Sequence, residues 1–502
     1  MNPLLVALVA VISVACCAAQ QESCFPPFEG RQPNVNSYNN LYGGEQDFSL
    51  ALLNAINKLM PKQNLFFSPY STYHALLIAY FMAGGETEAY LRKVLRLGDN
   101  QQRSDIYAAY KLDRLLTVHQ NAAYEFTSAN KIYVSDTVKV RGCVNADFPH
   151  ELESYPFKSD PEGCRNSINQ WVENTTHHMI TDLLPTGSID ASTSLVLVNA
   201  AYFKGVWENK FNPNLTRPEI FYVSPTKQIM VDMMHVEGSF RHDISETLGA
   251  HILELPYQGD NISMYILLPP FSNTEDSIDA TLKNLNLVNF RKLVERDSLI
   301  FRTVQVSLPK FSLETTIELV PVLESLGVGN LFKENANFHT LTNEKVSVGE
   351  GIHKAKIEIN ENGAHAAAAT AFLTWRMSDD EDVFYFRCDR PFIYLIYNGK
   401  THTVLFTGVL EQMGVGDLFQ SAGNLSELLE EGEAQLGGAL HKARIEVNEE
   451  GTKAAAATVL FSFRSSRPAE PAQFNCNHPF IYFVYDKVRA AMLFGGVFRR
   501  PY

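Results

Sequence analysis

The chain has 502 residues, of which 45% are hydrophobic and 11% aromatic, and its 42 Lys and Arg against 56 Asp and Glu give a formal net charge of −14. That much apolar material fills a large core, so disordered, collagenous and small disulfide-bonded classes are excluded. The acidic balance is spread along the chain, whereas nucleic acid and anionic membranes need clustered Lys and Arg. We therefore expect neither nucleic acid nor a membrane as a partner.

The N-terminal residues have the pattern of a secretory signal. An apolar run from Leu4 to Ala15 is too short to span a bilayer, and small residues lead from it to the polar Gln20. We expect cleavage after Ala19, which makes residues 1–19 a signal peptide and the mature protein secreted and extracellular. Asn-x-Ser/Thr sequons fit that compartment as glycosylation sites. The four predicted sites are Asn174, Asn214, Asn261 and Asn424.

Helices and strands are predicted in mixed order along the first 320 residues. Apolar residues at helical spacing predict helices over 48–59, 71–81, 104–118 and 164–184. The second of these follows Ser68-Pro69, a typical helix start. Runs rich in β-branched and aromatic residues predict strands over 129–134, 194–203, 251–255, 263–268 and 303–308. Interleaving without regular alternation predicts an α+β fold with large mixed sheets.

Seven cysteines stand at positions 16, 17, 24, 143, 164, 388 and 476, and the first two leave with the signal. Cys143 and Cys164 are close enough in sequence for a disulfide, and two buried free thiols are the equal alternative. No pair of residues has the Cys/His spacing of a zinc site. We expect no metal and no cofactor.

The C-terminal part of the sequence contains an internal repeat of two copies. HKAKIEINENGAHAAAAT begins at His353 and HKARIEVNEEGTKAAAAT at His441, an offset of 88 residues. Between 353–409 and 441–497, 26 of 57 positions are identical, yet only Arg376 and Ser378 match within 371–385. A scaffold is therefore kept while one stretch diverges. The predicted domains are the signal over 1–19, a main domain over 20–409 and a second C-terminal copy over 410–502.

Each copy carries Glu-x-Gly followed by four alanines and a threonine. Small residues after a glycine allow this stretch to slide between neighbouring strands as extended chain. At a period of two residues, Ala364, Ala366 and Ala368 share one face, while His365 falls on the other, as Lys453 does in the second copy. Neither copy then buries a charge on entering a sheet. An alanine-rich helix is the local alternative.

These features resemble the serpin family of serine protease inhibitors. The motifs stand in family order, as NLFFSPYSTYHALLIAYFMAGG at 64–85, LVNAAYFKGVWENKF at 197–211, LPKFSLE at 308–314, RPFIYLIY at 390–397 and LFTGV at 405–409. The resemblance implies a serpin fold, with a large central sheet, smaller sheets, about nine helices and an exposed reactive loop. It places the reactive loops at about 361–385 and about 449–473.

The resemblance also implies a mechanism and partner. A target serine protease attacks the loop and forms an acyl-enzyme, and the cut loop inserts into the central sheet as a new strand. The protease is thereby trapped in a covalent 1:1 complex, and the inhibitor is consumed. The protein is then a protease inhibitor and no enzyme, and we expect a monomer.

Individual roles follow from the matching positions. The resemblance implies hinges at Glu361, Gly363, Ala366, Ala367, Ala368 and Ala369, and at Glu449, Gly451, Ala454, Ala455, Ala456 and Ala457. It implies a cluster controlling sheet opening at Ser68, Ser71 and Asn199 together with His353 or His441. Lys310 is expected to pair with Glu361 or Glu449.

The scissile bonds are predicted within the divergent stretch. A trypsin-like primary pocket presents an Asp to Arg, which favours Arg376-Met377 and Arg464-Ser465. The hinge-to-bond spacing of the family is one residue longer and favours Met377-Ser378 and Ser465-Ser466 instead. The residues around the two arginines differ, so we expect the two loops to select different proteases.

The duplication conflicts with a single serpin fold, which has one place for its C-terminal strands. Either the sequence joins two C-terminal cassettes that are normally alternatives to each other, or one copy is attached to the other as an exposed extension. With one cassette, the mature chain carries an even set of cysteines, at 24, 143, 164 and either 388 or 476. We expect the first cassette in the fold, because it is contiguous with the rest of the domain.

Rival functions have less support. A non-inhibitory serpin acting as carrier, chaperone or storage protein usually has bulky, charged or proline residues in its hinge, and this chain does not. The sequence contains no nucleophile elbow, phosphate-binding loop or His-Glu-x-x-His motif that would indicate an enzyme. No strong polyanion site is expected, since residues 101–120 hold only Arg103, Lys111 and Arg114 as cations.

Overall fold

The structure is a computed structural model. It describes residues 23–26, 35–117, 124–259, 261–271, 277–294, 299–364, 383–412, 445–448, 451–454, 480–486 and 491–498. The chain divides into two compact units, 1–437 and 438–502. No helix within the described ranges is both long and apolar enough to cross a bilayer.

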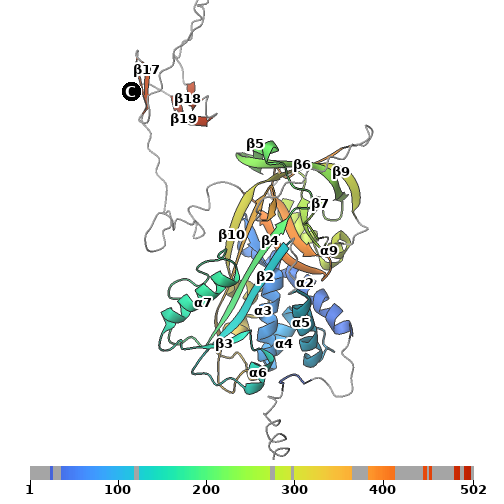
Figure 1. Ribbon diagram of the computed structural model, residues 1–502, viewed down its shortest axis with the longest axis vertical. Helices are drawn as coiled ribbons and strands as arrows, with labels where there is room; N and C mark the ends of the chain where they lie inside the picture. The colour runs from blue at the N-terminus through green and yellow to red at the C-terminus, as the bar shows by residue number, and fades with distance from the viewer. Residues whose placement is uncertain are drawn as a thin grey trace, which may run out of the picture. The chain divides into compact units, whose positions relative to one another are not determined.

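The described α-helices all belong to the first unit (Figure 1). They are α2 (Val35–Leu59), α3 (Pro69–Met82), α4 (Gly85–Val94), α5 (Arg103–Thr117), α6 (Gly142–Asp147), α7 (Pro161–Thr175), α8 (Ser277–Asn284), α9 (Leu287–Val294) and α10 (Leu319–Ser325), with short 3-10 helices η1 (Pro213–Leu215) and η2 (Gly329–Phe332). Helix α3 is buried at every residue, which fits its apolar composition on all sides. Ser68 caps it by accepting a hydrogen bond from the Ser71 N–H, and Pro69 begins it where no donor is needed.

A six-stranded sheet runs through the middle of the first unit. Its order is β10 (Phe311–Glu318), β11 (Val348–Asn360), β12 (Gly363–Ala364), β4 (Leu195–Val206), β2 (Tyr124–Ser135) and β3 (Leu152–Tyr155). Strands β11 and β4 pair in parallel up to Lys356 and Tyr202, and beyond that point β12 stands between them. Figure 1 shows β4 and β2 side by side along this sheet, with α7 at its lower end.

A nine-stranded sheet forms the second layer. Its order is β1 (Leu65–Phe67), β15 (Thr403–Leu410), β14 (Phe392–Asn398), β8 (Ile262–Leu268), β7 (Ala250–Pro256), β6 (Lys227–Ser245), β9 (Ile300–Pro309) and β13 (Phe384–Arg387), and β5 (Arg217–Ser224) pairs with β6. Every residue of β14 and β15 is buried, as their continuous apolar composition predicts for strands covered on both faces. These two strands close the core of the first unit.

The second unit is described as two short antiparallel pairs. One joins β16 (Ile445–Asn448) to β17 (Gly451–Ala454), and the other joins β18 (Phe480–Asp486) to β19 (Ala491–Phe498). The latter repeats the register of β14 and β15 at an offset of 88, including the irregularity after Ile396 and after Val484. The repeated sequence therefore forms the same strand pairing twice.

The α+β class and most predicted elements are confirmed, with one helix shorter than expected. The helix predicted over 164–184 ends at Thr175, because the hydroxyl of Thr176 donates to the Val172 carbonyl and caps the last turn. His177 and His178 follow with φ of 52° and 61°, which no helix continues. Apolar spacing beyond this point belongs to a loop packed against the sheet.

Neither alternative for Cys143 holds, although Cys164 is the buried free thiol that one of them expected. Cys143 of α6 is bonded to Cys24, with 5.1 Å between their Cα atoms, while Cys164 and Cys388 are free and buried. The reason is the neighbour of Cys24: Phe25 is buried among Phe81, Tyr107 and Phe148, which brings the N-terminal segment to α6. Sequence distance alone gave no sign of this contact.

Candidate functional site

The predicted hinge begins in a turn that the connection between β4 and β5 holds in place. The backbone N–H of Trp207 donates to the Asn362 carbonyl at 2.9 Å, and its indole N–H to the Asn360 carbonyl at 3.0 Å. The Phe211 N–H donates to the Glu361 carbonyl at 3.0 Å. Because Trp207 is fully buried in the hydrophobic core, these hydrogen bonds attach the turn to the core.

The Glu361 side chain is held by two donors. Lys310 Nζ lies 3.1 Å from its carboxylate, and the Thr216 hydroxyl donates to it at 2.9 Å. Burial would raise the pKa of Glu361, but hydrogen bonds from its own backbone, from Lys310 and from Thr216 outweigh burial and lower it. The sequence expectation of a Lys310 and Glu361 pair agrees with this geometry. Since Lys310 is nearly half exposed, the ion pair itself contributes about 1 kcal/mol at most.

His353 of β11 is fully buried, and its side chain lies in a hydrogen-bonded cluster. Its Nε2 accepts a hydrogen bond from the Ser68 N–H at 2.9 Å, and its Nδ1 is hydrogen-bonded to Asn199 Oδ1. Burial lowers the pKa of His353 to about 3, so the ring is neutral and carries its proton on Nδ1. The Ser68 hydroxyl donates to the Leu405 carbonyl at 2.7 Å, which ties the cluster to β15.

Asn199 connects three strands of this sheet. It is the register partner of His353 on β11 and of Asn130 on β2. Its amide donates to Ser71 Oγ at 2.9 Å and to Asn130 Oδ1 at 2.6 Å, and the Ser128 hydroxyl donates to Ser71 Oγ at 2.9 Å. The bond between His353 and Asn199 therefore crosses the seam between β11 and β4.

The structure thus sorts the predicted residues into two groups. Ser68, Ser71, Asn199 and His353 form one hydrogen-bonded cluster, whereas Lys310 joins Glu361 at the hinge turn. Sequence reasoning missed Ser128, Asn130, Trp207 and Thr216. A signal was available for the first two: Ser128 and Asn130 alternate with Ala129 along an otherwise strand-like run and therefore share one face of the strand.

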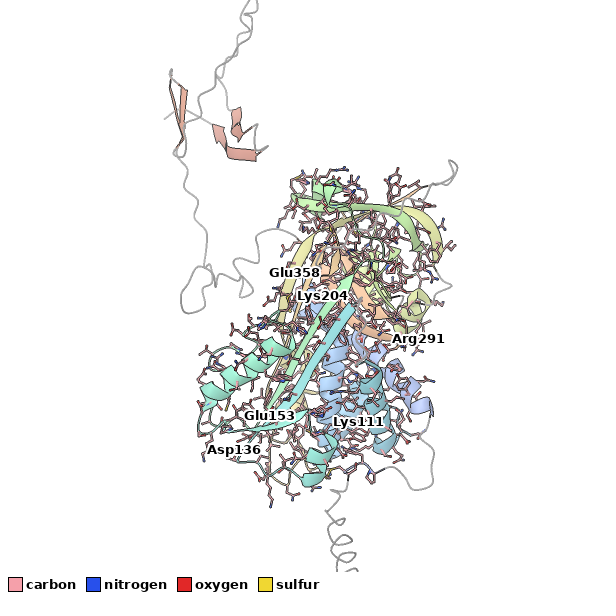
Figure 2. The ribbon with its side chains drawn as sticks, in the orientation of Figure 1. Lys111, Asp136, Glu153, Lys204, Arg291 and Glu358 are labelled. Atoms are coloured by element: carbon pink, nitrogen blue, oxygen red, sulfur yellow. A yellow bond between two sulfur atoms is a disulfide. The ribbon has the colours of Figure 1, made fainter. Side chains whose placement is uncertain are left out.

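Strand β12 marks the place where the seam is already parted. Gly363 and Ala364 pair with β11 on one side and with Val206 and Gly205 of β4 on the other. Figure 2 shows Lys204 of β4 and Glu358 of β11 at this end of the sheet, two residues beyond the last parallel pair. At this end of the sheet β11 and β4 no longer pair with each other, and both pair with β12 instead.

Several predicted residues lie outside the described ranges. They are the scissile-bond residues Arg376, Met377, Ser378, Arg464 and Ser465, the hinge residues Ala366, Ala367, Ala368, Ala369, Glu449, Ala455, Ala456 and Ala457, the cluster candidate His441, the sequon residue Asn424, and the signal over 1–19. The hinge glycines Gly363 and Gly451, with Ala454, are described as extended strand rather than helix.

The remaining predicted surface features lie in the first unit. Asn174 and Asn214 are exposed and Asn261 is half-buried. The three cations counted against a polyanion site are engaged within the fold. Arg103 donates to the Phe81 carbonyl at 2.6 Å, Lys111 to the Asp147 carbonyl at 2.7 Å, and Arg114 pairs with Glu151 at 2.8 Å. Within the described ranges, no group of three or more His, Cys, Asp or Glu side chains is placed to hold a metal.

Comparison with known proteins gives consistent matches. The family profile described as Serpin (serine protease inhibitor) matches residues 44–410 and again residues 407–501. Serine protease inhibitor 88Ea of Drosophila melanogaster is 38% identical over 388 residues, covering 74% of this chain and 90% of that protein. Antichymotrypsin-2 of Bombyx mori is 33% identical over 382 residues, covering 75% and 99%. The crystal structure of Serpin48 of Tenebrio molitor aligns with a TM-score of 0.66 at 26% identity, covering 78% of this chain and 100% of that one.

Proposed function

This chain belongs to the serpin family, and from that premise we propose that it is a secreted inhibitor that traps trypsin-like serine proteases. The protease attacks the exposed loop and forms an acyl-enzyme in a covalent 1:1 complex. The cut loop then inserts between β11 and β4 before water completes the hydrolysis. The inhibitor is a monomer and acts once.

One observation carries this proposal: β12 is wedged between the parallel strands β11 and β4. The residues that follow it in sequence are small, so they can continue the same strand without steric obstruction. Each added residue gains ladder hydrogen bonds worth about 1 kcal/mol and buries apolar surface. A strand of about a dozen residues then yields on the order of 10 kcal/mol or more, enough to distort a marginally stable protease.

Secretion is supported by the signal-like N-terminus and by the disulfide. The bond between Cys24 and Cys143 closes the N-terminal segment onto α6, and such bonds persist in oxidising compartments. We propose that Asn174, Asn214, Asn261 and Asn424 accept N-linked glycans in that compartment.

We propose that the second C-terminal copy is an alternative cassette. In a second form of the protein, residues 410–502 would follow the body of the domain directly and take the place of the first copy. The identical register of the two strand pairs supports this proposal. The proposed scissile bonds are Arg376-Met377 in the first cassette, with Met377-Ser378 as the alternative, and Arg464-Ser465 in the second.

The test mixes the full chain with trypsin-like, chymotrypsin-like and elastase-like proteases. A complex that survives boiling in detergent is expected with a trypsin-like protease, and Arg376→Ala should abolish it if the first loop is presented. Arg464→Ala serves as the matched control, and it becomes the sensitive variant if the second loop is presented. Cleavage without a stable complex would instead favour a non-inhibitory serpin that acts as carrier, chaperone or storage protein.

A further inference from the structure

The sequon at Asn214 lies on the segment that holds the hinge. Residues 207–216 connect β4 to β5, and they contact the hinge turn through Trp207, Phe211 and Thr216. Asn214 belongs to the 3-10 turn η1 within this segment and is exposed. Thr216, the third residue of the same sequon, is the residue whose hydroxyl reaches the Glu361 carboxylate.

The Thr216 hydroxyl is well placed to fix the hinge. It donates at 2.9 Å to Glu361 Oε1, while Lys310 approaches Oε2 of the same carboxylate at 3.1 Å. Thr216 is only partly exposed and Lys310 is nearly half exposed, so water screens the ion pair more than the hydroxyl bond. Hydrogen bonds to a charged acceptor are stronger than neutral ones. The threonine is therefore a substantial restraint on the Glu361 side chain.

The other described sequons do not share this position. Asn174 lies in the last turn of α7, where the hydroxyl of Thr176 is used to cap that helix. Asn261 is half-buried, and Ser263 of its sequon donates to Glu254 at 2.7 Å within the nine-stranded sheet. Only at Asn214, among these three, does the sequon hydroxyl touch a predicted hinge residue.

We propose that Thr216 is a positioning residue for the hinge, within the same sequon whose Asn214 is proposed above to carry a glycan. One tripeptide then carries the oligosaccharide and the hydroxyl that restrains Glu361. Asn214 is exposed, and its backbone N–H donates to Asn212 Oδ1 at 3.0 Å, a bond that a glycan on the side chain would leave in place. The inference rests on the proposed function, because it assumes secretion and a hinge that moves into the sheet.

Three variants of the secreted full chain separate the two roles. Asn214→Gln removes the glycan and keeps the hydroxyl, Thr216→Val removes both at nearly constant volume, and Thr216→Ser keeps both. The first readout is the mass of each protein before and after enzymatic removal of N-glycans. The second is the rate at which the uncleaved protein loses its capacity to form the detergent-stable complex at constant temperature, because a loosened hinge enters the sheet without being cut.

We expect Asn214→Gln and Thr216→Val to lack one glycan, and Thr216→Ser to retain it. Thr216→Val should lose capacity on the order of tenfold faster than Asn214→Gln, as removal of a hydrogen bond to a charged acceptor implies, and Thr216→Ser should behave as the parent. An unchanged mass in Asn214→Gln, or equal rates in Asn214→Gln and Thr216→Val, would overturn the inference. Failure of the parent to form any complex would refute the proposed inhibition instead, and the mass readout would still be interpretable.

Discussion

The two copies of the repeated C-terminal sequence form the same strand pair in different surroundings. In the first unit, β14 and β15 lie between β8 and β1 and are buried at every residue. In the second, β18 and β19 form a two-stranded sheet among the described residues. A two-stranded hairpin alone is at best marginally stable in water. The hairpin therefore adopts the same register in both places, while its stability comes from the strands on either side.

Gly408 allows the hairpin of β14 and β15 to pack against β1. A Cβ on Gly408 would lie 2.6 Å from the Tyr394 ring and would also collide with the Leu65 carbonyl of β1. Gly496 occupies the equivalent register position opposite Tyr482. Its retention in the second copy supports the proposal that this copy is an alternative cassette for the same place.

The largest expected effect follows from that glycine. Gly408→Val should destabilise the full chain by about 4 kcal/mol or more, since the obstacle is backbone that cannot move without disrupting β1. Thermal unfolding of the parent and variant measures the change. Gly496→Val is the matched control and should leave the main transition unchanged if the first copy fills the buried place. Equal losses from the two substitutions would show that both copies are needed for the fold.

The second prediction compares the two repeat histidines through pH. Unfolded His353 binds a proton below about pH 6.5, whereas burial keeps the folded ring neutral down to about pH 3. The unfolded state therefore binds more protons in this window, and stability falls as pH falls. At pH 4.5 this costs about 2.5 kcal/mol relative to pH 7. His353→Gln should remove that part of the pH dependence in denaturant unfolding.

His441→Gln is the control for that measurement, because it alters the equivalent residue of the second copy. It should leave the pH dependence of the main transition as in the parent. A pH profile that changes with His441 and not with His353 would place the second copy in the fold and reverse the comparison.

The smallest expected effect concerns the end of the first copy. Burial, followed by the charge of Asp279, raises the pKa of Glu411 to about 7, whereas Lys62 lowers it. Stability from this group is present below about pH 4.5 and is lost as pH rises through 7. The second copy has Arg499 at this offset.

We expect Glu411→Arg to stabilise the full chain by about 1 kcal/mol at pH 8. Both side chains are charged at that pH and both are disfavoured by burial, but an attraction to Asp279 replaces a repulsion, while Lys62 opposes the gain. Denaturant unfolding at pH 5 and pH 8 measures the gain, which should be smaller at pH 5. Destabilisation at pH 8 would show that an arginine does not fit there, and would weaken the alternative-cassette proposal.

The sequence predicted the parts of this molecule that depend on local pattern. An apolar stretch after Ser68-Pro69 located α3, and a run rich in β-branched and aromatic residues located β4. The order of motifs indicated the fold and most of the cluster around His353. The partner of Cys143 was missed because it depends on Phe25 entering a distant aromatic core. Thr216 was missed for a similar reason: its contact with Glu361 spans 145 residues and follows from the path of a connecting segment.

The most direct test of strand insertion compares the heat stability of the full chain before and after the first loop is cut by a non-target protease. If the cut loop continues β12 between β11 and β4, the unfolding midpoint of the main transition should rise by tens of degrees, because an added strand stabilises the sheet by on the order of 10 kcal/mol. Unfolding curves that coincide before and after cleavage would contradict the account.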